Sequence, residues 1–395
     1  MDDKNEQIYS QYTFNIKNVH KNKGIVYLDT SEGYYMIKPY NYTEYKINAE
    51  NKVKDMLEEK GYRYTDVCVK NKSGNCISYN KYMNKYIVKR WFKGEECEAT
   101  NIEDMSKASA NLARVHKLMQ RISLAEVEKT TGIGDEKLKN KEALRNELQE
   151  DEKSILGIDG ILNEVYGESK LEANLIEETK IAEVKTEDIK VAETKIAERN
   201  LLVEYRNQLK ELKRVKKYLY NKKRKNRLEI EIIKSLDTYY KEAEKYLEQL
   251  EKSAYEKLFE EAKKSMKICH GGYTHHGVIL IPSSEEVATI NFDKMHIGVQ
   301  IYDLYTLLRK TMEKNNWDIE QAREIIKAYD NEKRITKEEQ QILKILLGYP
   351  EKYRKLINSY YNGKKSCLHI RIYEKLNEYI ATEKIRQNFL NQLTF

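Results

Sequence analysis

Short apolar runs separated by turn residues fill the first hundred positions of the chain. YTFNIK, GIVYLDT and GYYMIKPY are rich in aromatic and β-branched residues, and Gly24 and Gly33 punctuate them. This pattern is typical of a small antiparallel meander. A helical pattern follows over about residues 43–60 and ends at Gly61, and YTDVCVK, NCISYN and YIVKRWF then repeat the strand pattern. We therefore predict a β-rich unit with one helix over residues 1–95.

After Gly94, apolar residues recur at helical spacing through most of the remaining chain. IEDMSKASANLARVHKLMQ and YYKEAEKYLEQLEKSAYEKLFEEAKKSMK follow this spacing, and EEVATINFDKMHIGVQIYDLYTLLRKT has the pattern of a strand, a turn and a helix. We predict a mainly helical unit assembled from residues 96–122 and 228–395. The two units together predict an α+β fold with two lobes.

Residues 123–227 interrupt this pattern with dense charge and small apolar residues. The hexapeptide ETKIAE occurs twice, 15 residues apart, in EETKIAEVKTEDIKVAETKIAERN. That spacing is about four helical turns, but no heptad runs through the segment. We predict an insertion that is either a long solvated helical hairpin or a partly disordered arm.

The insertion ends in a basic run, KRVKKYLYNKKRKNR, with nine Lys and Arg residues in positions 213–227. Such a run suits a patch for nucleic acid or another polyanion. It also suits the solvated end of a charged helix that balances the acidic repeat before it. We favour the second interpretation because no base-reading motif accompanies the run, and we expect nucleic acid not to be a partner.

Composition limits the compartment in which the chain acts. The 395 residues carry a net charge of +7 and contain five cysteines without a CxxC pair, which is typical of free thiols in a reducing compartment. No apolar run approaches the length of a transmembrane helix. The start, MDDKNEQIYSQYTF, is acidic and polar, unlike a signal peptide. We expect synthesis in the cytoplasm and no membrane partner.

A β-rich unit, a lysine on its third strand, a helix, a linker and a helical unit follow one another in the order of a protein-kinase-like fold. Lys38 stands where a strand-borne lysine would hold nucleotide phosphates, and Glu50 on the next helix could pair with it. Trp91, Gly94 and Glu95 fall at the linker. They would either present backbone groups to an adenine or serve as packing and turn residues.

The stretch CHGGYTHHG, residues 269–277, stands where such folds place the catalytic loop. Phosphotransfer of this kind uses an aspartate as base, an asparagine five residues later as metal ligand, and a second metal-binding aspartate about 20 residues further on. Gly272, Gly277 and Asn291 occupy these positions. A glycine supplies neither a base nor a ligand, so the sequence predicts a catalytic frame without its chemistry.

Three other residues of this region keep a defined place. His270 retains the loop histidine, and Asp303 in IYDLYTLL stands where these folds use a buried aspartate to brace the loop. Asp293 keeps a carboxylate near the metal position, so it is the residue that could still hold a metal ion.

Histidines, a cysteine and a glycine of this chain could also suggest a zinc site, a cysteine nucleophile or a phosphate loop. Zinc sites usually show regularly spaced ligand pairs, whereas His275 and His276 are adjacent and would point apart, so we expect structural histidines. Cys269 and His270 are sequence neighbours without an oxyanion element, and we expect Cys269 to be a buried strand residue. Gly24 could belong to a remnant phosphate loop. A single glycine is weak evidence for such a loop, and an ordinary hairpin turn explains it.

Five segments together resemble one family. IVKRWFKGEEC, LARVHKL, ICHGGYTHHGVIL, INFDKMHIGVQIYDLYTLLRK and LGYPEKYRKLINSYY resemble the CotS family of spore coat proteins, which is similar to the aminoglycoside and choline phosphotransferases. The resemblance covers residues 10–122 and 228–395. The family's usual loop resembles H-x-D-Y-x-x-x-N followed by I-D-F-D, and this chain departs from it at Gly272, Gly277 and Asn291. The resemblance implies a kinase-like fold, a place in the spore coat and other coat proteins as partners.

These observations predict a pseudokinase that acts in spore coat assembly through protein–protein contacts, without enzyme activity and without a cofactor. The alternative is a divergent small-molecule or protein phosphotransferase that uses ATP and magnesium, with Asp293 as a metal ligand.

Overall fold

The computed structural model describes residues 6–22, 25–120, 196–284, 286–362 and 368–394. The chain divides into two units, one made of Met1–Ile122 with Ala197–Phe395 and the other of Ser123–Ile196. Nearly all of the second unit lies outside the described residues, and so does the prediction of a helical hairpin or a disordered arm there.

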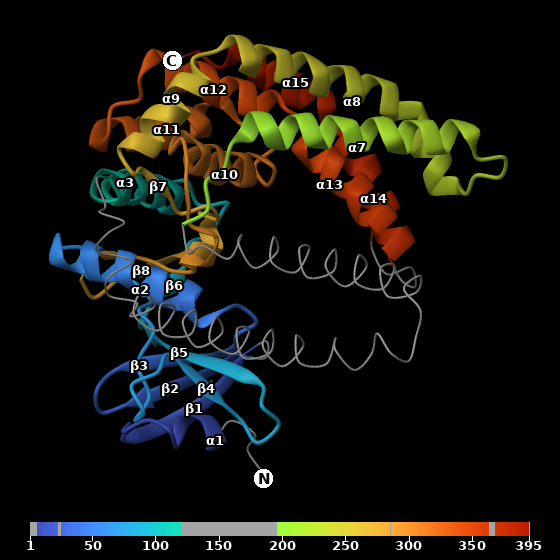
Figure 1. Cartoon of the computed structure of the whole chain (residues 1–395). Helices are drawn as coiled ribbons and strands as arrows, with labels where there is room; N and C mark the ends of the chain where they lie inside the picture. The colour runs from blue at the N-terminus through green and yellow to red at the C-terminus, as the bar shows by residue number, and fades with distance from the viewer. Residues whose placement is uncertain (1–5, 23–24, 121–195, 285, 363–367, 395) are drawn as a thin grey trace, which may run out of the picture. The chain divides into compact units, whose positions relative to one another are not determined.

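A five-stranded antiparallel sheet forms the N-terminal lobe of the first unit (Figure 1). Its strand order is β1-β2-β3-β5-β4. Because side chains alternate between the two faces of a strand, Val26, Leu28, Ile37 and Val88 gather on one face, where Ile8 of the short helix α1 packs against them. The elements are α1 (Glu6–Tyr9), β1 (Ile16–Asn22), β2 (Ile25–Thr30), β3 (Tyr34–Pro39), β4 (Ile77–Tyr79) and β5 (Lys85–Trp91).

The helix α2 (Glu44–Glu59) confirms the predicted helix between the third and fourth strands. Its first turn is capped by the Thr43 side chain, and Gly61 follows its end with a φ of +90°, which glycine adopts readily. The predicted strand YTDVCVK is wrong. Thr65 and Cys68 make only isolated bridges, and these go to two different sheets because the segment crosses from one lobe to the other.

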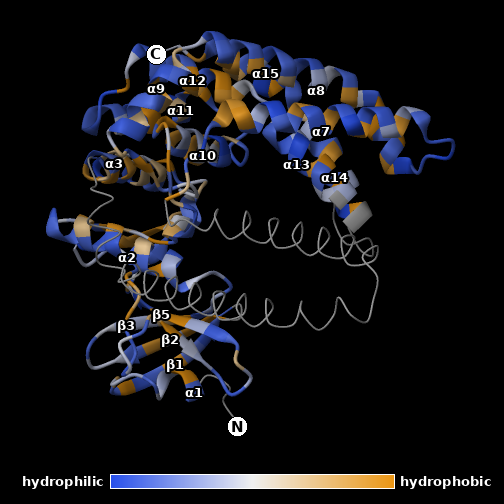
Figure 2. Cartoon of the chain, in the orientation of Figure 1, coloured by the Kyte–Doolittle hydropathy of each residue, from blue (hydrophilic) through white to orange (hydrophobic). Residues whose placement is uncertain are grey.

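Helices that share one apolar core form the C-terminal lobe (Figures 1 and 2). Each buries the apolar side chains that recur at helical spacing and leaves its charged residues in solvent. The helices are α3 (Ile102–Leu118), α8 (Arg227–Lys252), α9 (Tyr255–Lys264), α10 (Ile301–Met312), α11 (Ile319–Glu332), α12 (Lys337–Gly348), α13 (Glu351–Asn362), α14 (Leu368–Ala381) and α15 (Glu383–Gln392). The predicted α+β fold with a β-rich N-terminal lobe and a helical C-terminal lobe is confirmed. None of the described helices combines the length and the apolar composition that a membrane span requires.

Two small sheets accompany these helices and carry the loop of interest. One has the order β6-β8-β9, and the other pairs β7 with β10. Their strands are β6 (Glu95–Glu96), β7 (Ile268–Cys269), β8 (Val278–Ile281), β9 (Glu286–Thr289) and β10 (His296–Ile297).

The helix α7 (Leu201–Asn221) belongs to the helical lobe, although the sequence placed it in the insertion. It packs beside α8 and buries Leu201, Leu202, Tyr205, Leu212 and Leu219 in the shared core. The second unit therefore ends at residue 196 and not at residue 227. Charged residues outnumber these apolar ones in α7, which obscures the helical period in the sequence.

Met119, which precedes the insertion, and Ala197, which follows it, lie at the two edges of the β7–β10 pair. On one side, the backbone N–H of Ile268 in β7 donates to the carbonyl of Met119. On the other, the N–H of Ile297 in β10 donates to the carbonyl of Ala197, and Arg199 donates back to Ile297. The described residues that flank the insertion, Met119 and Ala197, thus lie beside the strands that hold the loop.

Candidate functional site

The loop between β7 and β8 is held by its first two backbone amides and by a buried histidine. The N–H groups of His270 and Gly271 donate to the Asp303 carboxylate at 2.6 and 2.8 Å. The His270 ring donates through Nε2 to the carbonyl of Ile290 at 2.9 Å and accepts through Nδ1 from the N–H of Gly272 at 3.3 Å. Burial lowers the pKa of His270, in keeping with this neutral tautomer.

Asp303 lies in the first turn of α10 and is fully buried. Its Oδ2 also accepts a hydrogen bond from His116 Nε2 at 3.1 Å, and His116 Nδ1 bonds the Tyr329 hydroxyl at 2.8 Å. Burial alone would raise the pKa of Asp303, but the bond from His116 outweighs it and the pKa is lowered. The carboxylate is therefore an ionised anchor that ties the loop to α3 and α10.

The glycines of the loop differ in what their backbone allows. Gly271 has a φ of +79°, and a Cβ there would lie 1.9 Å from the carbonyl oxygen of Lys294, so only glycine fits. A Cβ on Gly272 would have the Lys294 Cδ as its nearest neighbour, at 3.4 Å, and a Cβ on Gly277 the Ile290 oxygen, at 3.6 Å. These are ordinary contacts. The backbone therefore has room for a Cβ at residues 272 and 277.

Asn291 brings Lys38 to the position where a metal ligand would stand. Its left-handed backbone, with a φ of 66°, directs the N–H to Asp66 Oδ2 at 3.1 Å. Its side-chain oxygen accepts from Lys38 Nζ at 3.4 Å. Burial and the neighbouring Lys89 ammonium lower the pKa of Lys38. Asp293 follows two residues after Asn291, in the short 3₁₀ turn Phe292–Lys294.

Glu50 has other partners than the predicted Lys38. Its carboxylate bonds both Lys54 and Lys89 at 2.5 Å, and Asp66 bonds the same two lysines at 2.6 and 3.0 Å. The predicted Lys38–Glu50 pair is therefore wrong. Burial alone would raise the pKa of Asp66 and lower that of Lys89, but the opposite charges outweigh it, so both groups stay ionised.

Sequence reasoning missed Lys54, Asp66 and Lys89, which complete this four-charge cluster. Each side chain of the cluster is at most 2% exposed. Two signals were present: Lys89 interrupts the apolar run of YIVKRWF, and Lys54 stands four residues after Glu50, on the same helix face. The cluster links β5, α2 and, through Asp66, the backbone of Asn291.

The candidate metal ligands do not converge. Among the described residues no group of three or more His, Cys, Asp or Glu side chains could hold a metal ion. His275 bonds Lys314 at 3.0 Å, and His276 pairs with Glu96 at 3.0 Å. Burial lowers the pKa of His275 to about 4. Asp293 could therefore supply one carboxylate, but it belongs to no group of three or more such ligands among the described residues.

Cys269 does not have the setting of a nucleophile. It is fully buried in β7, and burial raises the pKa of its thiol well above the ordinary value. A thiol attacks as its thiolate, which burial disfavours. Gly24, where the sequence allows either a remnant phosphate loop or a hairpin turn, lies outside the described residues.

A cavity of about 410 Å³ lies at the linker that follows β5. Trp91 and Tyr27 line it with their rings 5.6 Å apart, and Ile279 of β8 lines it from the other lobe. Gly94 also lines it, but a Cβ there would lie 2.1 Å from the Leu280 oxygen, and Glu95 pairs with Leu280 in the β6–β8 ladder. Gly94 and Glu95 are thus packing and turn residues, while Trp91 faces the cavity.

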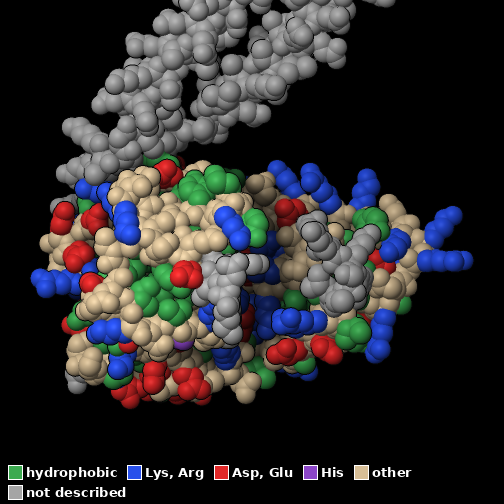
Figure 3. Space-filling view, turned by 90° about the horizontal axis from the view of Figure 1, so that it is seen from below, with side chains coloured by type: hydrophobic (Ala, Val, Ile, Leu, Met, Phe, Trp, Pro, Cys, Tyr) green, Lys and Arg blue, Asp and Glu red, His purple; other side chains and the backbone are tan. Residues whose placement is uncertain are grey.

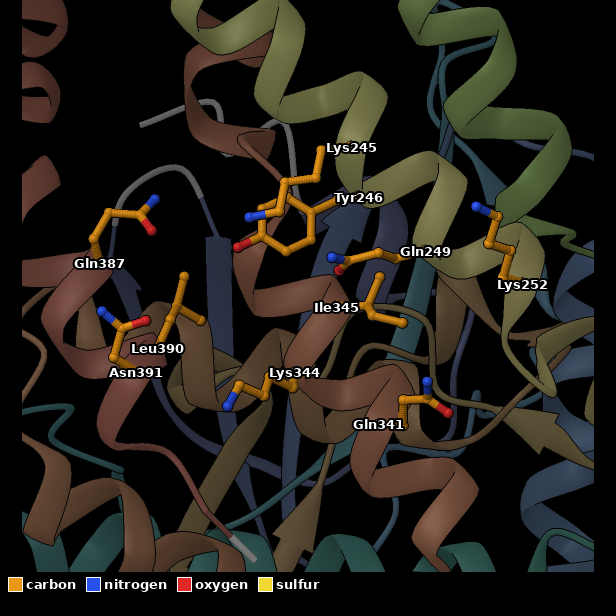
Figure 4. Close-up of a pocket in the computed structure, with 10 residues that line it drawn as sticks. All are labelled: Lys245, Tyr246, Gln249, Lys252, Gln341, Lys344, Ile345, Gln387, Leu390 and Asn391. Carbon is orange, nitrogen blue, oxygen red and sulfur yellow. The ribbon is translucent and has the colours of Figure 1, made fainter.

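A second hollow, of about 470 Å³, lies between α8, α12 and α15, on elements that carry none of the predicted site residues (Figure 4). Lysines and side-chain amides line it, and no carboxylate is among its lining residues. Its residues are Lys245, Tyr246, Gln249, Lys252, Gln341, Lys344, Ile345, Gln387, Leu390 and Asn391.

No family model matches the chain. Its structure is similar to that of an aminoglycoside phosphotransferase from Alicyclobacillus acidocaldarius, with a TM-score of 0.69 and 15% sequence identity over 97% of this chain and 92% of that one. It is also similar to an AMP-bound spectinomycin phosphotransferase, with a TM-score of 0.56 and 11% identity over 98% of both chains. A third similar structure is an amicoumacin kinase in complex with AMP-PNP and Ca²⁺. Its TM-score is 0.50 and its sequence identity is 11%, over 99% of this chain and 94% of that one. At these identities the likeness concerns the fold, and the chain has the protein-kinase-like fold of the aminoglycoside phosphotransferases.

Proposed function

We propose that this chain is a kinase-fold protein without phosphotransfer activity that acts by binding other proteins. One observation carries the proposal. The loop is fully braced by Asp303 and His270, yet glycine stands at the base position and at one metal position, and Asn291 at the other.

Phosphoryl transfer in this fold depends on a base that orients the nucleophile and on divalent cations that offset the phosphate charge. Gly272 and Gly277 contribute no side-chain group to either task. Asn291 offers a neutral oxygen, and that oxygen already accepts from the Lys38 ammonium. Neither glycine nor asparagine carries the negative charge that attracts a divalent metal ion, which supports the loss of metal-dependent chemistry.

The five segments that resemble the CotS family support a place in the spore coat, with other coat proteins as partners. The fold similarity to aminoglycoside phosphotransferases agrees with that resemblance, since CotS proteins are similar to them. The test is to fractionate sporulating cells and detect the chain in purified spores. Detection in the vegetative cytosol alone would contradict a coat role.

A thermal-shift titration tests the loss of metal-dependent nucleotide binding. We expect ATP with magnesium and ATP with EDTA to give melting temperatures within about 1 °C of each other, because a ligand stabilises only the state that binds it. A larger, magnesium-dependent shift that is lost in Asp293→Ala and kept in the exposed control Glu59→Ala would overturn the proposal.

A second function, divergent phosphotransfer with ATP and magnesium, has one observation in its favour. The cavity at the linker has aromatic walls, Tyr27 and Trp91, of the kind on which a purine stacks. The assay is transfer of label from γ-labelled ATP to hydroxyl compounds or to protein. Transfer that disappears in Asp293→Ala would establish this function in place of the first.

A further inference from the structure

The positive charge of the protein is concentrated at one place. Residues 213–227 carry nine Lys and Arg and no Asp or Glu, whereas the whole chain has a net charge of +7. This stretch forms the end of α7 and the turn into α8, where the two helices lie side by side (Figure 1). Figure 3 shows Lys and Arg side chains gathered at the same end of the view. These positions therefore form a local concentration of positive charge.

Most of these cations are not neutralised by the protein itself. Lys216 pairs with Asp237 at 2.5 Å and Lys222 with Glu229 at 2.6 Å. Five others are exposed and make no hydrogen bond or ion pair within the part of the chain that the structure describes. These five are Lys213, Arg214, Lys217, Lys223 and Arg224.

The neighbouring surface adds aromatic contact area. Tyr218 and Tyr220 are 52% and 51% exposed. Tyr218, Arg214 and Lys217 line a shallow hollow of about 470 Å³ on α7. Tyrosine and arginine are enriched where proteins bind one another. We call the five exposed cations, with Tyr218 and Tyr220, the basic tip.

Another segment of the same sequence is acidic. Residues 123–196 hold 19 Asp and Glu against 11 Lys and Arg, a net charge of −8, so the rest of the chain carries +15. Every copy therefore contains one basic tip and one acidic segment. Opposite charges that face each other across an interface speed association and favour the matching partner.

We propose that the basic tip of one copy binds the acidic segment 123–196 of a second copy. The contact is head-to-tail, because the two surfaces differ, and such contacts build open chains unless a rotation closes them into a ring. The proposal goes beyond the function proposed above and does not depend on the state of the catalytic loop. It predicts self-association that weakens as salt screens the charges.

Sedimentation of the full-length protein at about 50 mM and about 500 mM salt tests the proposal, since the Debye length falls several-fold over this range. Three variants accompany the wild type. The tip variant changes Lys213, Arg214, Lys217, Lys223 and Arg224 to Gln. The segment variant changes Glu177, Glu178, Glu183, Glu187 and Glu193 to Gln. The control changes the scattered exposed lysines Lys17, Lys70, Lys93, Lys327 and Lys337 to Gln.

We expect the wild type and the control to associate at low salt, and the tip and segment variants each to associate about tenfold or more weakly. A mixture of the two impaired variants keeps one intact tip and one intact segment, so it should form pairs and no longer chains. ATP thermal shifts should be the same in all four proteins, which separates this test from that of the catalytic loop.

A wild type that stays monomeric at low salt would overturn the proposal. Binding of the monomer to poly(U) RNA, lost in the tip variant alone, would make the tip a nucleic-acid surface instead. Equal association of the wild type and the tip variant would place the contact elsewhere. Tip and segment variants that melt at the wild-type temperature show that the changes act on association and not on folding.

Discussion

Gly271 and Gly272 are neighbours in one loop, but only Gly271 has a backbone that excludes other residues. Its φ of +79° and the 1.9 Å approach to Lys294 demand glycine, whereas Gly272 and Gly277 have room for a Cβ. Nothing in the loop's conformation therefore requires the loss of the aspartate and the asparagine. The loop therefore lacks the catalytic side chains, although its backbone has room for a Cβ at both positions.

The frame should accept the missing groups. We expect the triple variant Gly272→Asp, Gly277→Asn, Asn291→Asp to fold with a stability within about 1 kcal/mol of the wild type, because the two new Cβ atoms make ordinary contacts and aspartate tolerates a left-handed backbone. The variant should gain a magnesium-dependent thermal shift with ATP. The control, Gly271→Ala, should lose more than about 3 kcal/mol in urea titrations. A triple variant as unstable as that control would refute the packing argument.

The buried cluster of Glu50, Lys54, Asp66 and Lys89 makes a second prediction. Lys89→Met removes one cation and leaves two carboxylates short of a partner in an apolar setting, which costs about 3–5 kcal/mol. Lys38→Met is the matched control. It removes a partly buried lysine that donates a hydrogen bond to a neutral amide, so we expect a loss of about 1 kcal/mol. If urea unfolding showed equal losses of unfolding free energy in the two variants, the cluster would contribute no more to stability than the single Lys38 contact.

Buried histidines set the pH dependence of stability. Burial lowers the pKa of His116, His270 and His296 below their ordinary value of 6.5. Below pH 6.5 the unfolded chain then binds more protons than the folded one, so stability falls as the pH falls. We expect up to about 1.4 kcal/mol per pH unit for each histidine, measured as the free energy of unfolding between pH 7 and pH 5. A flat profile would contradict the buried neutral state.

At the scale of elements, α7 shows why the sequence was harder to interpret than the strands. The strand and helix patterns located β2, β3, β4, β5 and α2, and β2 shows the clearest alternation of buried and less buried positions. The same patterns placed the first strand at residues 12–17, whereas β1 spans Ile16–Asn22 and buries no side chain fully. In α7 the five buried side chains are spread over 19 residues among many charges, so the helix resembled a solvated arm. The charge cluster was missed for a related reason: residues 50, 54, 66 and 89 converge only through folding.

The packing of α7 can be tested directly. Leu212→Ala and Leu219→Ala each remove a side chain that is at most 2% exposed, and we expect each to cost about 2–4 kcal/mol. Val203→Ala, on the same helix and 52% exposed, should cost less than about 0.5 kcal/mol. If all three changes were equally mild in urea titrations, α7 would be a peripheral arm, as the sequence suggested.

At the scale of the whole molecule, the insertion is attached so that its removal should spare the fold. Met119 and Ala197 flank the β7–β10 pair, about three strand spacings or roughly 14 Å apart. Eight Gly and Ser residues reach about 27 Å and can replace residues 123–195 without strain. Because loop-closure entropy changes slowly with length, we expect this variant to melt within about 2 °C of the full chain. A fall of more than about 5 °C would show that the insertion stabilises the lobes. The variant keeps the basic tip but lacks its partner segment, so it should also lose salt-dependent self-association while it still binds the acidic segment of the tip variant.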